Sequence, residues 1–155
     1  VVGREDIIQA FTNANTIVSL ACGTLGPAMV RGLFESGEIL ALTRDYVTPF
    51  YRDRSNYAVA KLQKALSGLP FRIHKPEGAI FLWLWFEGLP ISSQELYRRL
   101  KKRGVIVVPG HNFFIGIDDQ WSHKNECLRI SYALDAASIN HGIELISEEV
   151  RAAYQ

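Results

Sequence analysis

Cysteine is scarce in this sequence of 155 residues, which contains only Cys22 and Cys127. Two cysteines are too few for a disulfide-stabilised scaffold, and their spacing matches no zinc-binding pattern, so we expect buried or incidental thiols in a reducing cytosol. Long apolar runs are also missing. None approaches the roughly 20 residues of a membrane-spanning helix, and the opening Val1-Val2-Gly3-Arg4 has no signal-peptide layout. A cytoplasmic protein is therefore expected.

The sequence also lacks an excess of charge of one sign. Its formal net charge is +1, and it has no dense tract of lysine and arginine. This excludes the electrostatic footprint of a protein that binds nucleic acid or anionic lipid, and it fits a small uncharged or zwitterionic ligand better. The histidines predict no metal site, because they offer neither helical spacing nor a second close pair; they are His74, His111, His123 and His141.

Apolar residues make up 48% of the sequence, enough for one domain with a hydrophobic core. Helical spacing predicts a short helix from Arg4 to Asn13, a break at residues 13–16, and a second helix from about Thr16 to Phe34. The second segment is rich in small residues and suits close packing against another surface. Three residues interrupt its pattern: Gly23, Gly26 and Pro27.

A long helical stretch is predicted from Gly37 to Ser67, with Pro49 inside it. Thr48-Pro49 is either an N-cap followed by a first-turn proline, or the proline kinks one continuous helix. We expect a domain boundary here: residues 1–47 would be the remnant of a larger body, and 48–155 would form their own domain. The chain opens on Val1-Val2-Gly3 without an initiator methionine, so a fragment is expected.

From Leu69 onward the pattern alternates between strands and helices, which predicts an α+β sheet covered by helices. Residues 79–86 are apolar on both faces and predict a buried central strand. Ser92 and Glu95 form a capping-box pattern, and Gly104 stands where that helix would end. The expected strands are 71–73, 79–86, 105–108 and 127–132; the expected helices are 93–103 and one beginning near Asp135 or Ser138, and 109–125 is a loop.

The strand at 127–132 divides into two faces. A period of two places Cys127, Arg129 and Ser131 on one face, and Leu128, Ile130 and Tyr132 on the other. Arg129 is therefore expected to point away from the apolar set.

Three segments resemble the class I/II aminotransferases of the fold-type I pyridoxal-phosphate superfamily, in matching order and spacing. They are PEGAIFLW at residues 76–83, Gly104 through Val108-Pro109-Gly110 to Phe113, and CLRIS at 127–131. The resemblance implies the small C-terminal domain of such an enzyme, with a mixed or antiparallel sheet, preceded by helices of the large domain. Within the family, HKPEGAIFLWLWF and RGVIVVPGHNFF are most similar to the branch that exchanges an amino group between L-valine and pyruvate.

The same resemblance implies that Arg129 holds the substrate α-carboxylate, because family members place an arginine in this strand. A guanidinium offers a planar fork of donors that matches a carboxylate. The alternative is an arginine in a structural salt bridge. Asn112 and Phe113, with Phe114, would border the substrate pocket, although either phenylalanine could instead fill the core. Ser19 and His111 are weaker candidates, and Gly78 and Pro109-Gly110 are expected to shape turns.

The family's cofactor, pyridoxal 5'-phosphate, is attached to a lysine that lies upstream in relatives. The lysines of this chain stand outside the serine-rich context that carries the cofactor, so the chain alone is expected to be inactive; they are Lys61, Lys64, Lys75, Lys101, Lys102 and Lys124. The family also implies a homodimer, whose contact could use the small residues around Gly23 and Gly26. Two alternatives stay open: a ligand-sensing domain of a transcription regulator, or an isolated domain without activity.

Overall fold

The computed structural model describes residues 3–18, 23–117 and 120–155. It divides into two units, residues 1–43 and 44–155, which are described separately below. The described helices of the first unit are α1 (Glu5–Val18), α2 (Leu25–Ser36) and α3 (Glu38–Leu42), and none of them contains a buried residue. The first unit therefore has no core of its own among its described residues.

The break predicted at residues 13–16 is wrong, because α1 continues through it to Val18. Polar side chains in this stretch bond within the helix. Gln9 donates to Asn13 Oδ1 at 3.0 Å, and the Thr16 hydroxyl donates to the Thr12 carbonyl at 2.8 Å. Side chains that favour turns elsewhere are thus satisfied in the helical conformation.

The predicted start of the second helix is also wrong, since α2 begins at Leu25. Pro27 is its third residue, in the first turn, where a missing N–H group leaves no helical hydrogen bond unmade. Ser19 and Cys22 lie outside the described residues.

Pro49 lies in the first turn of α4 (Thr48–Ala65), but Thr48 is not its N-cap. A π-helical turn, Thr43–Val47, precedes α4, and Val47 keeps helical dihedral angles of φ −69° and ψ −47°. Proline cannot donate the next hydrogen bond of an α-helix, and a π-helical turn changes the bonding pattern just ahead of it. The N-cap alternative is therefore wrong, and the helical run continues through Pro49 as the second alternative expected, with a π-helical turn that the sequence did not indicate.

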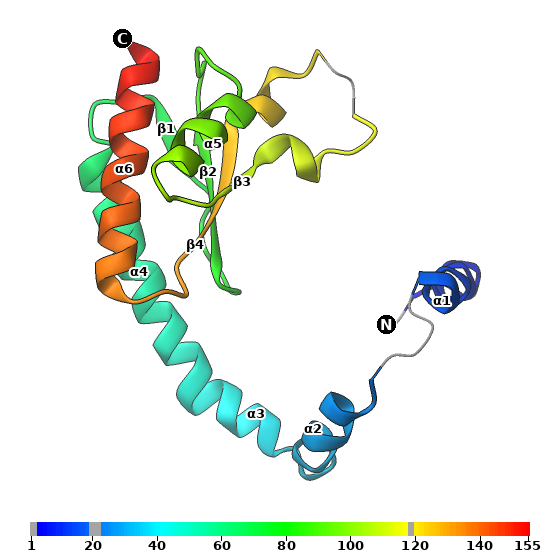
Figure 1. Ribbon diagram of the computed structural model, residues 1–155. Helices are drawn as coiled ribbons and strands as arrows, with labels where there is room; N and C mark the ends of the chain where they lie inside the picture. The colour runs from blue at the N-terminus through cyan, green and yellow to red at the C-terminus, as the bar shows by residue number, and fades with distance from the viewer. Residues whose placement is uncertain (1–2, 19–22, 118–119) are drawn as a thin grey trace. The chain divides into compact units, whose positions relative to one another are not determined.

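The second unit is built on one antiparallel sheet with the strand order β1-β2-β4-β3. Its strands are β1 (Phe71–Ile73), β2 (Phe81–Phe86), β3 (Val108–Pro109) and β4 (Cys127–Ser131). Figure 1 shows β2 and β4 at the centre of this unit. The expected helix-covered α+β sheet is confirmed, in its antiparallel form.

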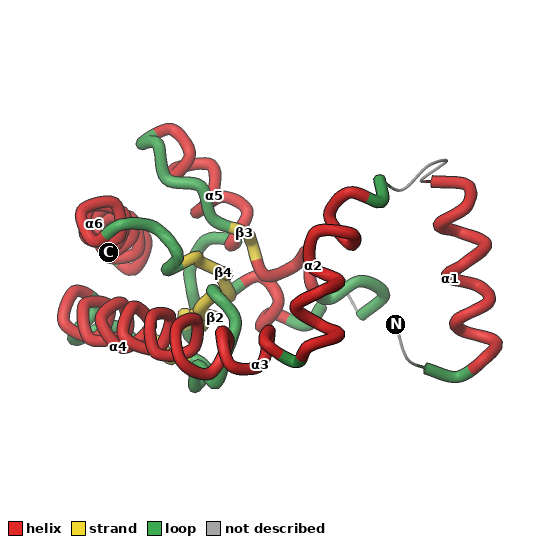
Figure 2. The backbone as a smooth tube through the Cα atoms, turned by 90° about the horizontal axis from the view of Figure 1, so that it is seen from below, coloured by secondary structure: helices red, strands yellow, loops and turns green. Residues whose placement is uncertain are grey.

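Helices α4, α5 (Ser93–Lys102) and α6 (Ala136–Tyr154) lie on one side of the sheet, as Figure 2 shows. The core is formed between them and the even-numbered side chains of β2 and β4. Its fully buried members include Leu62, Leu84, Leu100, Leu128 and Val150. The expectation that β2 is buried on both faces is only half right, because its odd-numbered side chains are exposed or half-buried.

The strand predicted at 105–108 is shorter and displaced, and pairs with β4 only at Val108–Pro109. β2 begins at Phe81 rather than residue 79. The turn before it uses Ala79, whose φ of 61° is left-handed, rather than the predicted Gly78. The Tyr132 hydroxyl donates to the Ala79 carbonyl at 2.6 Å, and this bond ties the strained residue to the end of β4.

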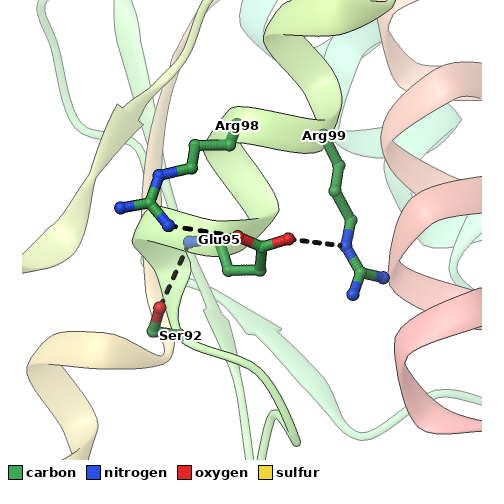
Figure 3. Close-up of polar contacts among 4 residues, drawn as sticks. All are labelled: Ser92, Glu95, Arg98 and Arg99. Carbon is green, nitrogen blue, oxygen red and sulfur yellow. Dashed lines mark hydrogen bonds and ion pairs between the residues drawn. The ribbon is translucent and has the colours of Figure 1, made fainter.

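Helix α5 begins at the predicted cap, where Ser92 Oγ accepts the Glu95 N–H at 3.1 Å. The reciprocal half of the capping box is not formed. The Glu95 carboxylate instead accepts hydrogen bonds from Arg99 and Arg98, each at 3.2 Å (Figure 3), and these lower its pKa. The helix ends as predicted, with Gly104 at φ 83°.

Helix α6 is capped by Asp135, whose carboxylate accepts the N–H of Ser138 at 2.9 Å and its hydroxyl at 2.7 Å. These bonds lower the Asp135 pKa below its usual value of 3.8. A lowered folded pKa contributes stability above the unfolded pKa and loses it as the pH falls through the folded pKa.

We expect Asp135→Asn to keep the cap, because asparagine caps as well as aspartate, and to remove this part of the acid sensitivity. The check is urea unfolding at pH 7 and at intervals from pH 5 to pH 2. The free energy of unfolding of the variant should fall less steeply below pH 4 than that of the wild type. Parallel curves would contradict the assignment.

Candidate functional site

On the sheet face opposite the helices, β2 and β4 carry six side chains, which we call the arginine face. They form cross-strand pairs between β2 and β4: Phe81 with Ser131, Trp83 with Arg129, and Trp85 with Cys127. The predicted division of β4 into two faces is confirmed, since Leu128, Ile130 and Tyr132 are buried on the helix side. The surface that Arg129 joins is aromatic rather than polar.

The Arg129 guanidinium contacts two phenylalanine rings. Its central carbon is 4.1 Å from the centroid of the Phe81 ring and 4.9 Å from that of Phe113. Its Nε is buried and has no hydrogen-bond partner. Within the described part of the chain, Arg129 makes no ion pair at all. The structural salt bridge considered from the sequence is therefore absent among these residues.

Three other described arginines also have no ion pair, but Arg54 and Arg151 donate to backbone carbonyls and Arg52 is exposed. Arg129 differs in being half-buried without a hydrogen-bond partner for its Nε. Arg72 pairs with Glu87, and Arg103 pairs with Glu148 and Glu149. A half-buried guanidinium without a counter-charge is costly to maintain, and an anion at its free edge would offset that cost. Because only Nε is fully buried, the terminal Nη atoms form the edge that an anion can reach.

Residues 110–117 and 120–125 carry aromatic side chains that contact the tryptophans of the arginine face. Phe113 and Phe114 contact the Trp83 ring edge-on, at centroid distances of 5.2 and 5.8 Å. Farther along, His123 contacts Trp85 at 4.7 Å. This segment contains two 3-10 helices, Gly110–Phe113 and Ser122–Asn125, where the sequence predicted an irregular loop. The aromatic contacts fix Phe113 beside Arg129.

Gly110 allows this segment to approach β4. A Cβ atom at this position would lie 2.6 Å from Cys127 Cβ, 2.8 Å from the Lys124 carbonyl oxygen and 2.9 Å from that of Cys127. The predicted shape role of Pro109-Gly110 thus has a definite cause at Gly110. Cys127 is fully buried, and burial raises the pKa of its thiol to about 11. It is a packing residue and not a nucleophile.

The predicted pocket residues are only partly brought together. Phe113 contacts Arg129 directly, while Asn112 is exposed in the same 3-10 helix and His111 is half-buried beside it. Neither Phe113 nor Phe114 belongs to the buried core, so the core-filling alternative is not what the fold uses. Sequence reasoning missed Phe81. Alternation along β2 could have placed it on one face, but not diagonally beside Arg129, because register is set by tertiary pairing.

The six lysines of this chain lie in two kinds of surroundings. Five of them are exposed on the surface of the second unit. Lys124 is buried, and its Nζ donates to the Ile117 carbonyl at 3.3 Å. No group of three or more His, Cys, Asp or Glu side chains that could hold a metal ion occurs among the described residues. Among the described helices, none is long and apolar enough to cross a membrane.

Comparison with known proteins identifies relatives along the whole chain. The chain is 44% identical over 154 residues to valine-pyruvate aminotransferase of Escherichia coli, which covers 99% of this chain but 37% of that protein. It is 28% identical over 117 residues, 74% of this chain and 27% of the relative, to the mitochondrial kynurenine/alpha-aminoadipate aminotransferase of Rattus norvegicus. No protein-family model matches. The chain therefore spans well under half the length of these relatives.

Solved structures show the same fold. The valine-pyruvate aminotransferase of Salmonella typhimurium matches with a TM-score of 0.84 and 42% identity, over 99% of this chain and 39% of that one. The alpha-aminoadipate aminotransferase of Thermus thermophilus, complexed with N-(5'-phosphopyridoxyl)-L-leucine, matches with a TM-score of 0.74 and 26% identity, over 99% of this chain and 37% of that one. By sequence and by fold, the chain belongs to the fold-type I pyridoxal-phosphate aminotransferase family, as its C-terminal part.

Proposed function

We propose that the intact protein carrying this chain is an aminotransferase that exchanges the amino group between L-valine and pyruvate, giving 2-oxoisovalerate and L-alanine. The similarity to the Escherichia coli enzyme supports these substrates. The chain's own contribution is to bind the carboxylate that all four compounds share. The observation that carries this role is the Arg129 guanidinium on the arginine face, which has no ion pair among the described residues and contacts the Phe81 and Phe113 rings.

Arg129 would bind the substrate carboxylate by donating two parallel charge-assisted hydrogen bonds from its Nη atoms to the carboxylate oxygens. The exposed Phe113 ring beside it offers an apolar surface for a branched side chain. Pyridoxal phosphate, when bound by the intact enzyme, would supply the electron sink for the α-carbon. The lysine that binds this cofactor would come from the remainder of the protein, and the chain alone would orient the substrate without reacting with it.

The preference for valine over similar amino acids depends on small differences in binding free energy. A hydrophobic pocket separates side chains that differ by one methylene by only about 1 to 3 kcal/mol, so neighbouring small or branched amino acids are expected as weaker substrates. Following the family, we also propose a homodimer that works in the cytoplasm.

The test is an assay of the intact protein with each of several amino acids and pyruvate, which follows alanine formation. Valine should give the highest kcat/KM. The 155-residue chain, mixed with pyridoxal phosphate and the same substrates, should form no alanine. A preference for a dicarboxylic or aromatic amino acid would replace the substrate assignment, and an intact protein without transaminase activity would overturn the function.

A further inference from the structure

The Phe81 ring has a defined relation to Arg129 that the proposed function does not yet use. Phe81 pairs with Ser131 across the sheet, so it is the diagonal neighbour of Arg129 on the same face. Its ring is the closer of the two, with its centroid at 4.1 Å from the guanidinium carbon against 4.9 Å for Phe113. Phe81 is 38% exposed, so it is not a residue of the buried core.

The backbone at Phe81 is tied to the strand that carries Arg129. The Tyr132 N–H donates to the Ile80 carbonyl at 3.1 Å, and the Tyr132 hydroxyl donates to that of Ala79. Tyr132 itself is 2% exposed and packs in the core. The turn before Phe81 therefore moves with β4, and the ring keeps its place over the guanidinium.

Stacking on Phe81 orients a guanidinium that has no carboxylate partner to orient it among the described residues. With no carboxylate partner among the described residues, the guanidinium is held by its neighbours, which include the Phe81 and Phe113 rings. A cation over an aromatic face is attracted to the ring, and planar stacking fixes the orientation of the guanidinium plane. Phe113 belongs to a separate segment, so Phe81 is the ring carried by the sheet itself.

We propose that Phe81 is a positioning residue for Arg129, which holds the guanidinium so that its Nη edge faces the substrate carboxylate. This inference rests on the proposed function of Arg129. A positioned fork loses less rotational freedom when it binds, so the effect should appear in substrate binding and not in the chemical step.

The experiment uses steady-state kinetics of the intact enzyme. Phe81→Leu should raise KM for both valine and pyruvate by about threefold to tenfold, with kcat changed less than about twofold. Phe81→Ile, which retains strand propensity, should behave in the same way if the leucine variant folds poorly. Phe81→Tyr keeps the ring and should restore KM to within about twofold of wild type. Tyr57→Leu removes an exposed ring that lies 5.3 Å from the Lys61 amine, and should leave KM unchanged.

A double-mutant comparison separates positioning from general packing. In an Arg129→Ala background, Phe81→Leu should raise KM by less than about 1.5-fold further, since nothing remains to be positioned. The same factor in both backgrounds, or loss of kcat without a change in KM, would overturn the inference. If Arg129→Ala raises KM but neither Phe81→Leu nor Phe81→Ile does, only the positioning role fails. If Arg129→Ala itself leaves KM unchanged, the proposed function of Arg129 fails.

Discussion

Replacing Arg129 by alanine in the intact enzyme is expected to raise KM for valine and for pyruvate by about 100-fold. Hydrogen bonds to a charged partner contribute roughly 1.5 to 3 kcal/mol, which corresponds to about 10- to 150-fold in binding. Arg129→Lys keeps the charge but loses the planar fork, so an increase of about tenfold is expected. Both substrates should be affected alike, because both carry the carboxylate.

The matched control is Arg98→Ala. Arg98 lies in α5, on the helix side of the sheet, and its side chain is 62% exposed and paired with Glu95. Exposed ion pairs contribute little to stability, and this one is not on the arginine face, so KM should not change. Kinetics with each substrate varied in turn is the measurement. Saturation of Arg129→Ala at wild-type concentrations would remove this residue from the site.

Gly110→Ala is expected to destabilise the folded chain by about 3 kcal/mol. The new Cβ would lie within 3.0 Å of three atoms, two of which are backbone carbonyl oxygens that cannot turn aside. Overpacking of this kind typically costs about 1 to 3 kcal/mol, and rigid backbone neighbours place this site at the upper end. Displacement of the segment would also carry Phe113 away from Arg129.

Gly142→Ala is the control for Gly110→Ala. Gly142 lies inside α6, and a Cβ atom there would meet nothing within 4 Å. Alanine should therefore stabilise the helix by about 0.5 to 1 kcal/mol. Urea unfolding of both variants gives the comparison. Cys127→Ala should not rescue Gly110→Ala, because alanine retains the Cβ atom that the new methyl group meets. Equal stability of the two glycine variants would show that the close approach at Gly110 is absent.

The sequence determined those features that depend on neighbouring residues. Alternation along the strand placed Arg129 on the face opposite to that of Leu128 and Ile130. The N-cap at Ser92 and the helix end at Gly104 followed from local chemistry. Where local signals were ambiguous, the predictions failed. Asn13 and Thr16 signal a turn by type, yet their side chains bond within α1. Gly78 signals the turn that Ala79 makes.

Only the tertiary structure decided what surrounds Arg129. The register of β2 against β4 brings Phe81 beside it, and the 3-10 helix that begins at Gly110 brings Phe113 to it. Register depends on pairing between strands that are far apart in sequence, and no local pattern specifies it. The sequence alone thus provided the arginine and the strand face on which it lies. The absence of a counter-charge for it among the described residues, which makes it a candidate carboxylate site, follows from the fold.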